Sequence, residues 1–263
     1  MKTTMNIAII GYGNMGKMIE QVAIGQGHTI GAIVDPLARE TKPLSGAPLF
    51  SAIADGNDLC GADVAIEFSQ PDTALENIKA LAERKIPAVV GTTGWFDRLD
   101  EARRIIEQAE SSLIYASNFS LGVNIFYRIA WCAAHLVDPF PEYDVGGFES
   151  HHNRKLDSPS GTAKTLVEGV LARLGRKEKA VWETLDRRPL PQELHYPSLR
   201  IGSVPGTHSL FLDSAADTIE ITHTARSREG FVRGSIRAAQ WLTSGGRKGF
   251  FSIDDMLAEI LGP

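Results

Sequence analysis

The residues best suited to chemistry lie in one segment, 149–162, which reads Glu-Ser-His-His-Asn-Arg-Lys-Leu-Asp-Ser-Pro-Ser-Gly-Thr. His151 and His152 can exchange a proton near neutral pH, and Lys155 adds a cation. If the chain is extended there, His151 and Lys155 point to the same side and His152 points to the other. The segment therefore combines a proton donor with a positive charge.

The same segment ends where a helix is expected to begin. Free N–H groups at a helix N-terminus bind anions, so those of Ser160, Gly161 and Thr162 would hold a carboxylate or a phosphate. A reductase for an acidic substrate needs all of these parts. Hydride adds at carbon, a proton must reach the atom that becomes electron-rich, and the carboxylates must be held. The segment thus favours chemistry on a small acidic molecule.

Two other interpretations of the segment stay open. A histidine pair with nearby cations is often no more than a solvated surface. A metal site is less favoured, because adjacent histidines on a strand point apart and no carboxylate–histidine motif on a helix completes the ligand set. We therefore expect no bound metal.

A second candidate site is the loop 11–16, Gly-Tyr-Gly-Asn-Met-Gly, which follows a strand pattern at 6–10 and opens a helical pattern. In the dinucleotide-binding fingerprint the first glycine allows a tight turn, the second lets the backbone approach a pyrophosphate, and the third lets the helix pack on the sheet. The alternative is a βα turn whose glycines serve packing alone. We expect a dinucleotide to be bound by the loop residues Gly11, Gly13, Asn14, Met15 and Gly16.

The acidic residue after the next strand pattern bears on which dinucleotide binds. Asp35 lies 24 positions after Gly11, where a carboxylate can accept hydrogen bonds from the adenosine ribose hydroxyls. It would repel a 2′-phosphate, and Pro36 provides no guanidinium at the next position. Lys17 and Arg39 could still reach a phosphate. We expect NADH, or use of both cofactors, rather than strict use of NADPH.

These sites need a framework, and the order of the elements indicates one. After a first strand–helix–strand unit, strand and helical patterns alternate at 64–68, 71–84, 87–90, 96–110 and 113–116. Strands that alternate with helices indicate a Rossmann-type α/β fold with a doubly wound parallel sheet.

The pattern changes after about residue 122. A long apolar helix at 123–136 is followed mainly by strand patterns, with one clear helix at 161–174. The alternation at 218–222 is typical of a half-buried antiparallel strand. We expect a second, α+β domain built on a mainly antiparallel or mixed sheet, with strands at 143–150, 199–204, 208–212 and 218–225.

Composition narrows the function classes. A net charge of −5 disfavours a general nucleic-acid binder, and no apolar run reaches the roughly 20 residues of a membrane span. The short N-terminal apolar run passes directly into the glycine loop, so it is interpreted as a strand and not a signal peptide. Cys60 and Cys132 have no second cysteine at metal-ligand spacing, which favours a reducing cytoplasm.

The motif Glu-x-His-His-x-x-Lys-x-Asp-x-Pro-Ser-Gly-Thr-Ala at 149–163 resembles the signature of the 4-hydroxy-tetrahydrodipicolinate reductase family of the diaminopimelate–lysine pathway. Four other segments resemble the family in its own order. They are Val-Gly-Thr-Thr-Gly at 90–94, Ser-Asn-Phe-Ser-Leu-Gly-Val-Asn at 117–124, Arg-x-Gly-x-x-x-Gly-x-His at 200–208 and Ile-Thr-His-Thr-Ala-Arg-Ser-Arg at 221–228. The resemblance therefore covers most of the chain.

This resemblance implies roles for individual residues. His151 would be the proton donor or its close partner, and Lys155 the second catalytic group. The substrate carboxylates would be held by His152, Lys155, Ser160, Gly161 and Thr162. The nicotinamide would be lined by Gly91, Thr92, Thr93, Ser117, Asn118 and Phe119.

The resemblance also implies a homotetramer built from the second domains, and a first domain completed by C-terminal helices at about 231–244 and 254–261. We thus expect a dinucleotide-binding domain at 1–122 plus 233–263, and a substrate-binding and oligomerisation domain at 123–232. Pro36 stands where family members that use NADPH often carry Arg, which disfavours NADPH.

The expected reaction is the NAD(P)H-dependent reduction of 4-hydroxy-tetrahydrodipicolinate (dihydrodipicolinate) to tetrahydrodipicolinate, in the cytoplasm, without nucleic-acid or membrane partners. One alternative is another two-domain dehydrogenase, acting on an amino acid or a sugar, which would not explain segment 151–162. The other is a non-catalytic NADH-sensing protein, which would need neither the proton donor nor the anion site.

Overall fold

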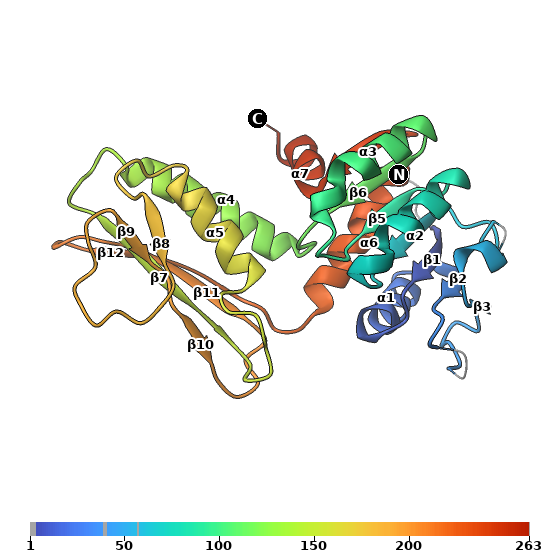
Figure 1. The fold of residues 1–263 in the computed structure, drawn as a ribbon, viewed down its shortest axis with the longest axis horizontal. Coiled ribbons are helices and arrows are strands. Elements are labelled where there is room, and N and C mark those ends of the chain that lie inside the picture. The colour runs from blue at the N-terminus through green and yellow to red at the C-terminus, as the bar shows by residue number, and fades with distance from the viewer. Residues whose placement is uncertain (1–3, 39–40, 57, 263) are drawn as a thin grey trace. The chain divides into compact units, whose positions relative to one another are not determined.

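The computed structural model describes residues 4–38, 41–56 and 58–262, and the chain divides into two compact units (Figure 1). Unit 1 comprises Met1–Ser120 and Glu229–Pro263, and unit 2 comprises Leu121–Arg228. The sequence analysis set these boundaries at 122 and 233. Arg39, one of the two cations considered for a 2′-phosphate, lies outside the described residues.

Within the described part of unit 1, seven parallel strands form one sheet in the order β13-β6-β5-β4-β1-β2-β3. The central strands are almost entirely buried because helices cover both faces: β1 (Asn6–Ile10), β4 (Val64–Glu67) and β5 (Ala88–Val90). The outer strands are β2 (Thr29–Val34), β3 (Leu49–Phe50), β6 (Ser112–Tyr115) and β13 (Gly249–Ser252). The expected doubly wound parallel sheet is confirmed.

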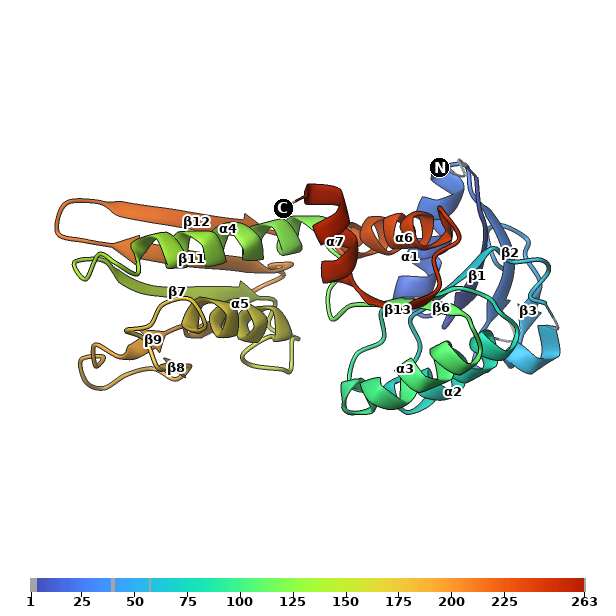
Figure 2. The ribbon, with the colours of Figure 1, turned by 90° about the horizontal axis from the view of Figure 1, so that it is seen from above.

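Helices α1 (Asn14–Gly25) and α6 (Glu229–Thr243) pack on one face of this sheet, and α2 (Pro71–Glu83) and α3 (Leu99–Gln108) pack on the other (Figure 2). The remaining elements are α7 (Ile253–Leu261) and the 3₁₀ helices η1 (Ile53–Gly56) and η2 (Phe96–Arg98). The sequence analysis expected both C-terminal helices but missed β13. That strand has only four residues, too few to show a period.

In unit 2, the described strands include a four-stranded mixed sheet in the order β10-β7-β11-β12. Strand β7 (Asp144–His151) runs antiparallel to β11 (Thr207–Asp213) and parallel to β10 (Ser198–Arg200). β12 (Thr218–Thr224) completes the sheet. This confirms the mixed sheet. The segment 177–197 contains both strands of a separate small sheet, β8 (Lys179–Val181) and β9 (Glu193–His195).

Two helices fill the core of unit 2 and fix one another: α4 (Leu121–Val137) and α5 (Gly161–Leu171). Tyr127 and Trp131 of α4 stack with ring centroids 5.4 Å apart. Each donates a hydrogen bond to α5, Tyr127 to the Thr162 carbonyl at 3.3 Å and Trp131 to the Leu166 carbonyl at 3.1 Å. These bonds hold the N-terminal half of α5 in place.

Helix length also bears on the expectation of no membrane partner. In the part of the chain that the structure describes, no helix combines the length and the apolar character that a membrane crossing needs.

Candidate active site

The glycine loop lies at the carboxyl end of β1, beside the ends of β2 and β4. The Gly11 N–H donates to the Val34 carbonyl, and the Phe68 N–H donates to the Ile10 carbonyl, both at 2.8 Å. Gly11 has φ +89°, and a Cβ on it would lie 2.2 Å from the Phe68 carbonyl oxygen. Only glycine fits there. The loop thus occupies the edge where open α/β sheets bind their ligands.

The start of α1 has room for a pyrophosphate. Gly13 is the N-cap of the helix and has no side chain to bond the N–H groups of the first turn. A Cβ on Gly13 would meet nothing within 4 Å, whereas one on Gly16 would lie 2.1 Å from the Gly11 carbonyl oxygen. Asn14 is exposed and Met15 half-buried. The loop is therefore closed by packing at Gly16 and open at Gly13, which fits a bound dinucleotide.

Asp35 follows β2 and is fixed by backbone N–H groups. Its Oδ2 accepts a hydrogen bond from the Tyr12 N–H at 2.7 Å, and its Oδ1 accepts one from the Leu37 N–H at 2.8 Å. Each oxygen has a second lone-pair site for a ribose hydroxyl. The Tyr12 hydroxyl donates to the buried Glu20 carboxylate, and burial together with this carboxylate raises the pKa of Tyr12. Asp35 is thus positioned by the same loop that would bind the pyrophosphate.

The loop after β5 lies next to the loop after β4. Gly91 donates its N–H to the Glu67 carbonyl at 2.8 Å, and Thr92 Oγ1 accepts from the Ser69 N–H at 2.8 Å. The Phe119 ring lies 6.5 Å from that of Phe68. Of the residues predicted to line a nicotinamide, Thr93 and Ser117 are exposed and the buried ones are Thr92, Asn118 and Phe119.

In unit 2, strand β7 ends at His151 and the chain then turns. The Lys155 N–H donates to the His152 carbonyl at 3.1 Å, and Lys155 Nζ lies 2.7 Å from Asp157 Oδ1. The chain is therefore not extended from His151 to Lys155, and the prediction that both side chains point to the same side of an extended chain is wrong. Burial raises the pKa of Asp157, but the hydrogen bond and charge of Lys155 offset this and hold it below its usual value.

His151 is the buried member of the histidine pair, with 8% of its surface exposed, whereas His152 is half-buried. Burial lowers the pKa of His151; the charge of Glu149 opposes this, and the charges of Lys155 and Arg200 add to it. These surroundings favour the neutral form of the imidazole when no substrate is bound. The turn thus still brings the Lys155 charge to bear on His151, although not along one strand face.

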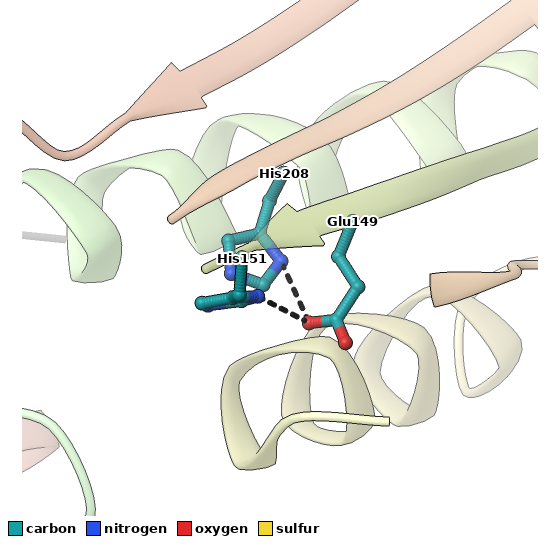
Figure 3. Close-up of side chains that lie close together, drawn as sticks. All are labelled: Glu149, His151 and His208. Atoms are coloured by element: carbon teal, nitrogen blue, oxygen red, sulfur yellow. Dashed lines mark ion pairs between the residues drawn. The ribbon is translucent and has the colours of Figure 1, made fainter. Parts of the chain in front are cut away.

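A buried carboxylate joins the end of β7 to the start of α5. Glu149 Oε2 lies 3.4 Å from His151 Nδ1 and 3.9 Å from His208 Nδ1 (Figure 3). Its Oε1 accepts hydrogen bonds from Ser198 Oγ at 2.7 Å and from Arg200 Nη2 at 3.1 Å. Burial raises the pKa of Glu149, but hydrogen bonds from Ser160 and Ser198 offset this, so that its pKa lies below the usual value.

The sequence predicts an anion site at the start of α5, and the structure shows how the backbone there is bonded. Ser160 is the N-cap and accepts a hydrogen bond from the Ala163 N–H at 3.1 Å, but its own N–H donates to Glu149 Oε1 at 3.0 Å. A free Ser160 N–H, as expected from the sequence, is therefore wrong. Gly161 is exposed, and a Cβ on it would meet nothing within 4 Å. The backbone open to an anion thus begins at Gly161.

Sequence reasoning missed Arg200 and His208 as members of this site. Both come from strands that pair with β7: Arg200 is opposite His151 on β10, and His208 is opposite Glu149 on β11. Their positions in the chain are about 50 residues from β7, so only the strand register reveals the contact. One ligand atom from each of Glu149, His151 and His208 lies within 4.8 Å of the others, a spacing that a metal ion could also use.

Two family models together match nearly the whole chain. The model described as dihydrodipicolinate reductase, N-terminus, matches residues 5–119, and the one described as dihydrodipicolinate reductase, C-terminus, matches residues 122–257. A 4-hydroxy-tetrahydrodipicolinate reductase from Christiangramia forsetii is 39% identical to this chain, over 97% of this chain and 99% of the relative.

Some solved structures share the fold of this chain although their sequence identity to it is low. A dipicolinate-bound dihydrodipicolinate reductase from Paenisporosarcina sp. TG-14 has a TM-score of 0.77 at 21% identity, with 95% of this chain and 97% of that chain covered. An amine dehydrogenase from Mycobacterium smegmatis has a TM-score of 0.63 at 9% identity, with 95% of each chain covered. These likenesses support the two-part α/β fold.

Proposed function

The chain belongs to the dihydrodipicolinate reductase family, and from this premise we propose that it reduces 4-hydroxy-tetrahydrodipicolinate to tetrahydrodipicolinate with a nicotinamide cofactor. The observation that carries the proposal is the arrangement at the end of β7. There the buried His151 imidazole is followed by the turn that carries Lys155, and Glu149 links the strand to the start of α5, where Gly161 is exposed. These are the groups that a reductase of a cyclic dicarboxylate requires.

Unit 1 would hold the cofactor. The backbone from Gly11 to Gly16 would bind the pyrophosphate, and Asp35 would accept the ribose hydroxyls. The nicotinamide would lie against the loop after β5 and the residues Ser117, Asn118 and Phe119. When bound, it supplies a hydride to the C4 position of the substrate ring. Because the Asp35 carboxyl group lies where the ribose is expected and would repel a 2′-phosphate, NADH is favoured over NADPH.

Unit 2 would hold the substrate. His152, Lys155 and the N–H groups of Gly161 and Thr162 would bind its carboxylates, and His151 or Lys155 would supply the proton as the ring electrons reorganise. Negative charge near an imidazole favours its protonated form. A bound dicarboxylate would therefore raise the pKa of His151 from its lowered value and prepare it to donate. Ser160 would act through its cap on α5 rather than through its N–H.

The catalytic residues can be tested one at a time. His151→Gln and Lys155→Ala should each lower kcat by roughly 10²–10⁴-fold, because positioned acid–base catalysis contributes about that much. Turnover would be measured as oxidation of NADH with enzymatically generated substrate. His135→Gln, on the exposed side of α4, is the matched control and should leave kcat unchanged. Near-normal kcat in both site variants would reject the assignment.

The family premise also supports two coarser expectations. A homotetramer would assemble through unit 2, and the protein would work in the cytoplasm, where reduced nicotinamide cofactors and its small-molecule substrate are available.

A further inference from the structure

We propose that Glu149 is a positioning residue for this reaction: its carboxylate orients the His151 imidazole and ties it to the start of α5, while His208 lies beside the same carboxylate oxygen. The inference rests on the proposed function, in which His151 is a proton donor. A positioning role of this kind does not require Glu149 or His208 to contact the substrate.

The position of Glu149 on β7 places its carboxylate beside His151. Glu149 lies two residues before His151, so that both side chains emerge on the same face of the strand. Glu149 is fully buried, and its Oε2 faces the Nδ1 atoms of His151 and His208 (Figure 3). A carboxylate beside Nδ1 favours the Nδ1–H tautomer of a neutral imidazole and leaves Nε2 as the atom that exchanges a proton with a ligand.

Glu149 is held by residues from several elements at once. Ser160 on the α5 side donates both its N–H and its hydroxyl to the carboxylate. Ser198 and Arg200 donate to it from β10. His151 and the start of α5 are therefore both positioned by the Glu149 carboxylate. A shift of Glu149 would displace both of them.

The Nε2 edge of the His151 imidazole is also closely approached, by the backbone of Gly206. Gly206 has φ +149°, and a Cβ on it would lie 3.0 Å from His151 Nε2. This backbone conformation and this close approach both favour glycine. The imidazole is thus confined between the Glu149 carboxylate at Nδ1 and the Gly206 backbone near Nε2.

The effect of Glu149 on the pKa of His151 depends on the other charged groups around the imidazole. The groups that act on His151 are Glu149, Lys155, Asp157, Arg200 and His208. Only Glu149 and Asp157 are negative, and Asp157 is bonded to Lys155. Burial lowers the pKa of His208 to about 4, so this second imidazole adds no positive charge beside Glu149, whose cationic partner is Arg200. Removing the Glu149 charge should therefore shift the His151 titration to lower pH.

The test is NMR titration of His151 in the full chain, together with steady-state kinetics, for Glu149→Gln. The proposal predicts that the His151 pKa falls. It also predicts that kcat at pH 7.5 drops about 10-fold or more, with a smaller change in KM, because the variant loses imidazolium and its orientation but keeps the carboxylate-binding backbone. In Glu149→Asp, which keeps the charge, the pKa of His151 should be closer to the wild-type value. This variant serves as the test if Glu149→Gln does not fold.

The matched control is Glu193→Gln, which removes the charge of another buried glutamate of unit 2 that pairs with Arg187 and Lys179. It should leave the His151 titration unchanged. An unchanged His151 pKa in Glu149→Gln, or activity that requires added zinc, would overturn the proposal. If the pKa shift is present but the wild type does not turn over, the positioning geometry stands and the proposed function fails.

Discussion

At the residue scale, the two carboxylates Asp35 and Glu149 are held by hydrogen-bond donors in the structure. Asp35 accepts two backbone N–H groups, and Glu149 accepts three side-chain donors and one backbone N–H. Such anchoring fixes where a charge lies before a ligand arrives, which is what binding and catalysis both exploit. It also means that a substitution at either position changes more than one bond.

Asp35 gives a prediction about cofactor choice. Asp35→Asn should weaken NADH binding about 10-fold, the worth of a hydrogen bond to a charged group. NADPH binding should weaken less, because the repulsion of its 2′-phosphate is removed at the same time. Fluorescence titration with both cofactors measures this. Equal losses for the two would instead show that the variant acts only by releasing the Tyr12 N–H and the loop.

At the scale of elements, the sites lie where strands end. The glycine loop, Asp35 and the loop after β5 follow the parallel strands β1, β2 and β5, and His151 ends β7. Glu67 belongs to this set, since it ends β4 and is fully buried with bonds from Ser69 and Asn77. Burial raises the pKa of Glu67 more than its hydrogen bonds with Ser69, Thr92 and Asn77 lower it.

Glu67 therefore makes the stability of unit 1 depend on pH. Its folded pKa is above its unfolded value, so the folded state holds the proton longer, and stability falls as pH rises from about 4.5 through the raised pKa. Glu67→Gln cannot ionise. Its apparent Tm relative to the wild type should rise with pH across that window, as measured by thermal denaturation. The exposed Glu83→Gln is the control, and parallel Tm curves for Glu67→Gln and wild type would contradict the assignment.

The sequence was sufficient for elements that carry a long period or a distinctive motif. The parallel strands with their helices, the glycine loop and the start of α5 all have local patterns that determine them. It was insufficient where structure depends on distant partners. Arg200 and His208 join the site through strand register. The Ser160 N–H is bonded to Glu149. The turn at 152–155 means that His151 and Lys155 are not on one face of an extended chain.

At the scale of the whole molecule, the fold alone does not decide the reaction. An amine dehydrogenase shares the architecture at low identity, so the decision rests on the motif at 149–163 and on the family match along both units. Unit 1 is built from both ends of the chain, so that α6, β13 and α7 complete the sheet and helices that carry the candidate cofactor loops.

Assembly is a separate prediction at this scale. Unit 2 exposes apolar side chains on or next to its outer strands β10 and β12, namely Leu199, Ile201 and Ile219. These side chains are available for contacts with partner chains. Light scattering of the purified protein should therefore give four times the chain mass of 28.6 kDa. Ile219→Lys should reduce that mass, and a monomeric wild type would contradict the proposed tetramer.

The central claim is that this chain reduces the cyclic dicarboxylate with a nicotinamide cofactor. The most direct measurement is the loss of NADH absorbance when 4-hydroxy-tetrahydrodipicolinate, generated enzymatically in the same cuvette, is presented to the purified protein. The account predicts NADH oxidation that matches the substrate supplied and that nearly stops in His151→Gln. Absence of NADH and NADPH oxidation, under conditions where NADH binding is demonstrated by fluorescence, would contradict it.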